Sequence, residues 1–333
     1  MNAAGRSLLS VFSFSLLFSS TLALANECNK RVESDAMSDR IVNAALNEHA
    51  VFNGHRIDAN GRLWKFGATE TENEFLLDPA MGEPGVTTSR RIAWRRVWEY
   101  WRVLDGHVPG IAMSRKVISF SGVLSDEVIN TGAEETRLSE LFSFLGEDQS
   151  EGKESLRQAA VRAALSDSPW SAAFISYVMH QAGLDAEQFR YAAAHWQYVK
   201  QAFNDNPRYA YRACDPRRTR PRKGDLLCYS RGATSPDNFA AWRDAVMLPG
   251  FSAASHCEVV VSVDRAASKI ETVGGNVLQS IAMRRLKLNR EGVLSAAHYE
   301  RPGGVLSATC ESGKGCREAD LSTQRWSVLL QLR

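Results

Sequence analysis

The stretch Ser168–Gly183, with the sequence SPWSAAFISYVMHQAG, is the part of the chain that is most informative about the fold. Proline is common in the first turn of a helix, and glycine is common just after its last residue. We therefore predict one helix that opens at Ser168-Pro169-Trp170 and runs to about Ala182. Most of its side chains are small or apolar, which indicates a buried helix. Ser171 falls in its first turn.

Helical patterns surround this stretch, and short strand patterns follow it. Apolar residues recur at helical spacing before Asn53-Gly54 and over Arg91–Leu104, Leu156–Leu165 and Ala186–Phe203. Four β-type runs separated by turn residues then cover Asp225–Ser230, Glu258–Val263, Lys269–Val273 and Ser280–Leu288. Helices followed by strands, without regular alternation, predict an α+β fold.

The first 25 residues have the order of a secretory signal peptide. Arg6 precedes an apolar run over Leu8–Leu24, and the small-residue triplet Ala23-Leu24-Ala25 marks a cleavage site. Serines interrupt the run, whereas a membrane span needs about 20 clearly apolar residues. We therefore predict a periplasmic or secreted protein with no integral membrane segment in its mature form.

All six cysteines follow the predicted cleavage site, where an oxidising compartment allows disulfides. Glycines in the intervening loop favour a Cys310–Cys316 bridge. Cys257 is expected either to pack in the core or to bridge to Cys228 on a neighbouring strand. No cysteine pair has CxxC spacing, and no phosphate-binding or dinucleotide motif occurs, so we expect no metal and no cofactor.

The polar segment 146–154, GEDQSEGKE, is predicted to be a linker or an exposed loop. It divides the mature chain into a mostly helical N-terminal region over residues 26–150 and a second domain over residues 155–333. The formal net charge of +2 gives no reason to propose a nucleic acid as partner.

The second domain contains four sequence motifs. In chain order they are Ser168–Gly183, Lys223–Arg231 (KGDLLCYSR), Ser255–Val261 (SHCEVVV) and Gly274–Asn276 (GGN). This order resembles the papain-like NlpC/P60 and CHAP families of cell-wall hydrolases, over roughly residues 169–288. The fuller chain, including Trp94–Trp101, resembles a bacterial group catalogued as domain of unknown function 2272, which brings no established activity.

The resemblance implies a papain-like fold, with a helix packed on an antiparallel sheet, and a role for each of three residues. Ser171 stands at the nucleophile position, His256 at the general-base position and Asn276 at the position that orients the base. A nucleophile in the first turn of a helix lies where unpaired N–H groups can stabilise an oxyanion. The implied substrate is peptidoglycan or a cell-wall peptide.

The chain differs from these families in having a serine where they have a cysteine. A helix end and an imidazolium can lower a thiol pKa from about 8.5 to about 3.5, whereas an alcohol stays neutral at pH 7 and needs a true general base. Two hypotheses follow. The protein is either a peptidoglycan amidase or endopeptidase-like hydrolase that uses Ser171 and His256, or a catalytically inactive module that binds a cell-wall peptide or a partner protein.

Two further residues near these motifs have open interpretations. Strand alternation puts Glu258 on the same face as His256, where its carboxylate would stabilise an imidazolium; the alternative is a solvated or ion-paired surface residue. His195, beside Trp196, is expected to pack in the core or on a helix surface, with substrate contact as the less favoured alternative. Trp94–Trp101 is also interpreted as core.

Overall fold

The computed structural model describes Cys28, residues 36–72 and 93–114, single positions between 159 and 166, and residues 168–232, 235–299, 309–311, 315–317 and 320–333. The predicted signal peptide, the segment 146–154 and most of the predicted helix Leu156–Leu165 lie outside the described residues. Within these described ranges, every helix is too short or too polar to span a membrane.

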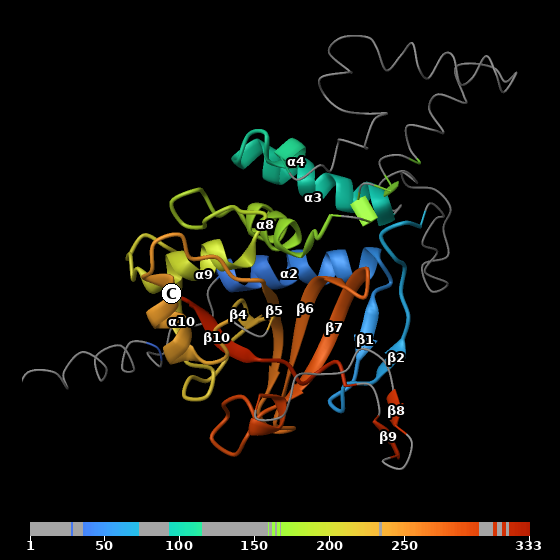
Figure 1. Cartoon of the computed structure of the whole chain (residues 1–333), viewed down its shortest axis with the longest axis vertical. Coiled ribbons are helices and arrows are strands. Elements are labelled where there is room, and N and C mark those ends of the chain that lie inside the picture. The colour runs from blue at the N-terminus through green and yellow to red at the C-terminus, as the bar shows by residue number, and fades with distance from the viewer. Residues whose placement is uncertain are drawn as a thin grey trace, which may run out of the picture.

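An eight-stranded sheet organises the molecule, in the order β2-β1-β7-β6-β5-β4-β10-β3 (Figure 1). Neighbouring strands are antiparallel except for β1 and β7, which are parallel. The strands are β1 (His55–Ile57), β2 (Leu63–Lys65), β3 (Tyr211–Cys214), β4 (Leu226–Ser230), β5 (Ser255–Asp264), β6 (Lys269–Val277), β7 (Ser280–Lys287) and β10 (Trp326–Leu332). A separate hairpin pairs β8 (Thr309–Glu311) with β9 (Gly315–Arg317). All four predicted strands are present.

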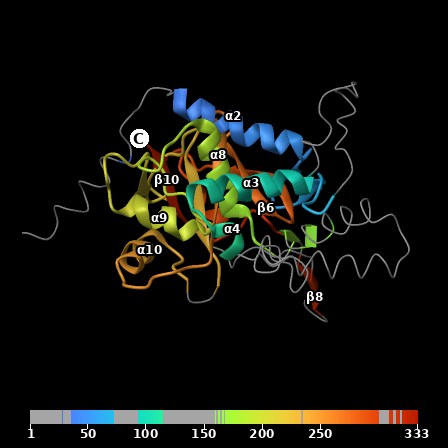
Figure 2. The same cartoon turned by 90° about the horizontal axis from the view of Figure 1, so that it is seen from above.

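Helices cover one face of the sheet in two layers (Figures 1 and 2). They are α2 (Ala36–Val51), α3 (Ala93–His107), α4 (Ile111–Ser114), α8 (Ser171–Ala182), α9 (His195–Phe203) and α10 (Phe239–Val246). A 3-10 turn, η2 (Ala296–His298), lies apart from these helices and contacts β7. Helices α2, α8 and α9 pack directly on the strands, and α3 packs on the outer side of α8. The predicted α+β fold class is therefore confirmed.

The N-terminal region shares this sheet. Strand β1 pairs with β7, and α2 packs across β5, β6 and β7 through buried side chains that include Ile41 and Ala45. The sequence predicted a helix before Asn53-Gly54, and α2 confirms it, but β1 and β2 were not foreseen. The described residues before position 72 therefore complete the sheet of the second domain.

Helix α8 has the limits that its sequence predicts. It begins at Ser171 after Trp170, and it ends at Gly183, which adopts the left-handed conformation with φ 85°. His180 and Gln181 are its exposed residues, and all its other side chains are buried. This helix is consequently the centre of the helix layer, between the sheet and α3.

The predicted helix over Ala186–Phe203 is correct only from His195 onward. The Asp185 carboxylate accepts hydrogen bonds from the backbone N–H groups of Glu187 and Gln188, and the Ser176 hydroxyl pairs with the backbone of Ala192. Such side-chain bonds to the backbone compete with helical hydrogen bonds. Residues 185–194 therefore form turns that bring His195 to the start of α9.

Two disulfides tie the described chain together. Cys28 is bonded to Cys214, and Cys228 is bonded to Cys257 across the β4–β5 pair. The second bond confirms that Cys257 bridges to Cys228. Cys310 and Cys316 are register partners in the β8–β9 hairpin, but their side chains lie outside the described part of the structure.

A buried ion pair joins three helices beneath the surface. The Glu48 carboxylate of α2 accepts hydrogen bonds from the Arg96 guanidinium of α3 and, at 2.6 Å, from the Tyr100 hydroxyl. Arg96 also donates to the hydroxyl of Tyr177 on α8, at 2.7 Å. Trp94 and Trp101 of α3 are buried in the same apolar core, as expected. This network fixes α3 on top of α2 and α8.

Candidate active site

Ser171 is the first residue of α8, and its hydroxyl lies at the helix end where backbone N–H groups have no intrahelical partner. Only 8 % of its surface is exposed. The positive end of the helix dipole favours negative charge at this position. An oxyanion that formed next to the Ser171 hydroxyl would consequently be stabilised.

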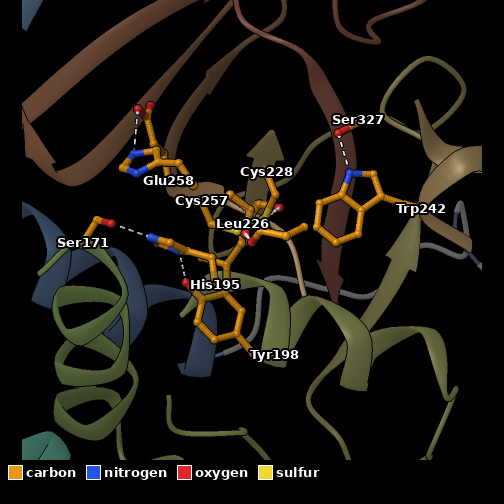
Figure 3. The surroundings of a disulfide bond; sticks show 12 residues. Ser171, His195, Tyr198, Leu226, Cys228, Trp242, Cys257, Glu258 and Ser327 are labelled. Carbon is orange, nitrogen blue, oxygen red and sulfur yellow. Dashed lines mark hydrogen bonds and ion pairs between the residues drawn. A yellow bond between two sulfur atoms is a disulfide. The ribbon is translucent and has the colours of Figure 1, made fainter. Parts of the chain in front are cut away.

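His195 is the side chain that Ser171 contacts. Its Nε2 lies 2.7 Å from Ser171 Oγ, and its Nδ1 is hydrogen-bonded to the Tyr198 hydroxyl, one turn further along α9 (Figure 3). His195 is 3 % exposed and Tyr198 is fully buried. His195 is buried, as its sequence context predicts, and it also contacts Ser171, which the sequence did not indicate.

His256, near the start of β5, lies next to this pair. Its ring centroid is 5.1 Å from that of His195 and 5.2 Å from that of Tyr229, its register partner on β4. The ring is fully buried. In the described part of the chain, neither ring nitrogen has a hydrogen-bond partner, although Nε2 lies 3.4 Å from Glu258 Oε1.

Glu258 is a buried member of the site and is not solvated. Its carboxylate accepts hydrogen bonds from Arg284 at 2.9 and 3.2 Å and from the Thr272 hydroxyl at 2.5 Å, and it has no exposed surface. Burial alone would raise the pKa of Glu258, but Arg284 and then His256 outweigh it and lower that pKa to about 2. Glu258 is therefore ionised at neutral pH.

Both histidines are neutral at neutral pH. Burial lowers the pKa of His256 to about 4; Glu258 partly opposes this effect, and the positive charge of Arg231 adds to it. Burial also holds the pKa of His195 well below its usual value, with further lowering by His256 and Arg231. Each ring can therefore accept or donate through an uncharged imidazole.

The Gly274-Gly275-Asn276 segment, at the end of β6, lets α8 pack close to the sheet. A methyl group on Gly275 would lie 2.6 Å from Phe174 Cγ, and one on Gly274 would lie 2.6 Å from Glu258 Cγ and 3.0 Å from His256 Nε2. Asn276 has φ 54° and makes no hydrogen bond to His256. Glycine is required here because any side chain would displace the site.

Three of the four predicted site residues thus belong to one buried cluster, namely Ser171, His256 and Glu258. Asn276 lies at the end of the adjoining strand and makes no hydrogen bond to the ring that it was expected to orient. Sequence reasoning missed the roles of Tyr198, Thr272 and Arg284. The i, i+3 spacing of His195 and Tyr198 was the available signal, but that spacing is too common to be specific. No group of three or more His, Cys, Asp or Glu side chains among the described residues could hold a metal ion.

The fold and the site define an α+β protein in which a serine at a helix N-terminus is hydrogen-bonded to a histidine of the next helix, above a buried histidine–glutamate–arginine cluster. Residues 88–332 match the family described as "Uncharacterized protein conserved in bacteria (DUF2272)", and the chain belongs to this family. The prediction of that family is confirmed. No curated protein and no solved structure matches the chain.

Proposed function

We propose that the protein is a serine-dependent hydrolase of amide bonds in the cell envelope, with peptidoglycan peptides as its substrate. The observation that carries this proposal is the 2.7 Å contact between Ser171 Oγ and His195 Nε2 at the N-terminus of α8. A serine oxygen that an imidazole contacts, next to unpaired helix N–H groups and with the second imidazole of His256 beside it, is an arrangement suited to acyl transfer.

The reaction would proceed by acyl transfer to Ser171. Its Oγ attacks the carbonyl carbon, its proton passes to an imidazole, and the resulting oxyanion faces the first turn of α8. Collapse of this intermediate breaks the C–N bond, and the imidazolium returns the proton to the leaving amine. Water then attacks the acyl-enzyme by the same route, which releases the carboxylic acid and restores Ser171.

The charged residues behind the histidines would stabilise the protonated imidazole. Glu258 lies 3.4 Å from His256 and is kept ionised by Arg284, so the formation of an imidazolium on His256 would create an ion pair. We assign the orienting role to Glu258 because its carboxylate lies 3.4 Å from His256 Nε2, whereas Asn276 makes no hydrogen bond to the ring.

The envelope location and the substrate are supported by different observations. Two disulfides are compatible with an oxidising compartment outside the cytoplasm, and the first 25 residues have the pattern of an export signal. The motif order around Ser171 and His256 resembles that of cell-wall hydrolases. These observations together favour a wall peptide over other amides.

The alternative is a non-catalytic module that holds a wall peptide or a partner protein. The burial of the site favours this alternative, because Ser171 and His195 are only 8 % and 3 % exposed. In that case Ser171→Ala would change the affinity for a wall peptide by less than about tenfold, since one neutral hydrogen bond contributes about 0.5–1.5 kcal/mol.

A fluorophosphonate probe separates the two functions without knowledge of the scissile bond. An activated serine attacks the phosphorus atom and expels fluoride, which leaves an adduct that mass spectrometry can map. We expect the adduct on Ser171, release of peptidoglycan fragments by the wild-type protein, and loss of both in Ser171→Ala. The matched control is Ser322→Ala, which changes a buried serine whose hydroxyl donates to the backbone oxygen of Asp58 and not to the site.

Two outcomes would contradict the hydrolase. If the wild-type protein forms no adduct and releases no fragment, the proposed activity is wrong. If fragments appear only with Ser171→Cys, the native site is inactive although its geometry suits catalysis. The helix end lowers the pKa of a thiol enough to form a thiolate, whereas an alcohol stays neutral.

A further inference from the structure

We propose that Tyr198 fixes His195 as a hydrogen-bond donor to Ser171, so that His195 stabilises negative charge on the serine oxygen while His256 is the base. The catalytic part of this inference rests on the proposed hydrolase function. The hydrogen bonds among Tyr198, His195 and Ser171 concern the protein without substrate, and they can be tested independently of any activity.

The Tyr198 hydroxyl decides the position of the proton on His195. This hydroxyl is fully buried, and His195 Nδ1 is its one hydrogen-bond partner in the described part of the chain. If Nδ1 carried a proton and donated it to the tyrosine oxygen, the tyrosine O–H would be left buried and unpaired. A buried unpaired donor is costly, so the tyrosine O–H donates and Nδ1 accepts.

The neutral ring must then carry its proton on Nε2. Burial together with the neighbouring His256 and Arg231 keeps His195 uncharged, so only one of its nitrogens is protonated. With Nδ1 accepting from Tyr198, Nε2–H donates to Ser171 Oγ across the 2.7 Å contact. A ring in this state cannot take the serine proton, and its hydrogen bond stabilises an alkoxide-like oxygen instead.

The serine proton must therefore leave by another route. The Ser171 hydroxyl has no acceptor other than His195 in the described structure, and its 8 % exposure lets it reach water or a substrate. The cost of an unpaired hydroxyl is thus smaller at Ser171 than at the fully buried Tyr198, which supports the same proton assignment.

His256 has the complementary arrangement. Its Nε2 faces the ionised Glu258 carboxylate, which can only accept, so Nε2 carries the proton and Nδ1 keeps its lone pair. That lone pair is buried and has no partner, and such an atom in a native structure calls for an explanation. Acceptance of the Ser171 proton would supply one, since His256 lies beside the His195 ring that contacts Ser171, with 5.1 Å between the two ring centroids.

The charged groups around the two histidines also favour His256 as the base. Glu258, at 3.4 Å, would stabilise a proton on His256 against the opposing charges of Arg231 and Arg284. A proton on His195 would face the neutral groups of Ser171 and Tyr198, with His256 and Arg231 opposing it. The buried carboxylate therefore supports His256 as the base and leaves His195 as the donor.

The first test reads the tautomers directly. Long-range ¹H–¹⁵N spectra of the whole protein, assigned with His195→Gln and His256→Gln, distinguish a protonated from an unprotonated ring nitrogen. We expect His195 to be protonated at Nε2 in the wild-type protein and to lose this preference in Tyr198→Phe. The matched control Tyr209→Phe removes another buried hydroxyl, one that donates to the backbone oxygen of Tyr198, and should leave the His195 signals unchanged. Protonation at Nδ1 of His195 in the wild-type protein would overturn the proposal.

The second test measures the rate at which the fluorophosphonate probe labels Ser171. Glutamine at position 195 still offers an N–H donor, so His195→Gln should keep at least about a tenth of the wild-type rate, whereas His256→Gln should lose the general base and about 10²–10⁴-fold. The reverse order of the two variants would contradict the assignment. If the wild-type protein is not labelled at all, the hydrolase proposal fails, and the tautomer spectra still decide between a donor and an acceptor at His195.

Discussion

Cys28 is bonded to Cys214, 186 positions further along the chain. This bond fastens the N-terminal part of the described chain to β3, the strand at one edge of the sheet. The second bond, Cys228–Cys257, closes a separation of only 29 positions between two adjacent strands. The two disulfides therefore constrain the unfolded chain to very different extents.

Removal of the longer cross-link should cost more stability. We expect Cys28→Ala combined with Cys214→Ala to lower the free energy of unfolding by about 2–5 kcal/mol, and by more than the matched pair Cys228→Ala with Cys257→Ala, because the loss of entropy in the unfolded chain grows with loop length. Urea unfolding of both double variants measures the difference. A larger loss for the shorter loop would contradict this account and would point to packing next to His256.

The Glu48–Arg96 pair should behave as a buried ion pair. Arg96→Met leaves the Glu48 carboxylate buried and without its guanidinium partner, so the free energy of unfolding should fall by about 3–5 kcal/mol. Replacement of both partners, Arg96→Met with Glu48→Leu, should recover most of this loss, because no unpaired charge remains. Urea titrations of the two variants test the prediction, and a single variant as stable as the wild-type protein would contradict it.

Glu70 should make stability fall as pH rises. Its carboxyl accepts a hydrogen bond from Trp170 Nε1, and burial raises the pKa of Glu70 to about 7 from 4.5. The folded protein therefore binds this proton more tightly than the unfolded chain does. The stabilisation is complete below about pH 4.5 and is lost as pH rises through about 7.

Glu70→Gln removes this dependence while keeping an acceptor for Trp170. Relative to the wild-type protein, the variant should gain stability between pH 4.5 and pH 7.5, as measured by urea midpoints at a series of pH values. A stability difference that does not change over this range would show that Glu70 titrates normally.

Gly274 should be essential for the site although it has no side chain. Gly274→Ala would place a methyl group 2.6 Å from Glu258 Cγ, so the Glu258–His256 contact must shift, and labelling of Ser171 should slow by at least about tenfold. Gly183→Ala is the matched control. It costs about 1 kcal/mol or more through the left-handed backbone at φ 85°, yet a methyl group there meets nothing within 4 Å, so labelling should be unaffected. Equal slowing in both variants would indicate a general loss of stability.

The elements that the sequence predicted are those defined by local signals. Helix α8 has proline at its start and glycine after its end, and β4 to β7 alternate with clear turn residues. The short strands β1, β2 and β3 lacked such signals. β1 and β3 pair with β7 and β10, which are distant in sequence, and the three-residue β2 pairs with β1. The misplaced start of α9 has the same cause, since Ser176 of another helix holds the preceding turn.

The same distinction between local signals and long-range contacts applies to the candidate active site. Ser171, His256 and Glu258 could be proposed from motifs that lie within single elements. The contact of His195 with Ser171 depends on how the chain turns over residues 185–194, and the partnership of Glu258 with Arg284 depends on the register of three strands. Neither relationship is visible in local spacing, so the second histidine and the arginine had to come from the structure.

The order of the strands has a consequence for the time course of folding. Strand β10, at residues 326–332, lies between β4 and β3, and β1, at residues 55–57, lies against β7. Pairings between such distant segments give a high contact order, and folding rates fall as contact order rises. During synthesis β3 and β4 emerge before β10, which lies between them. The sheet therefore cannot be completed until the last residues have been made. If the protein is exported as we propose, this delay would keep the nascent chain unfolded for as long as passage through a secretion channel requires.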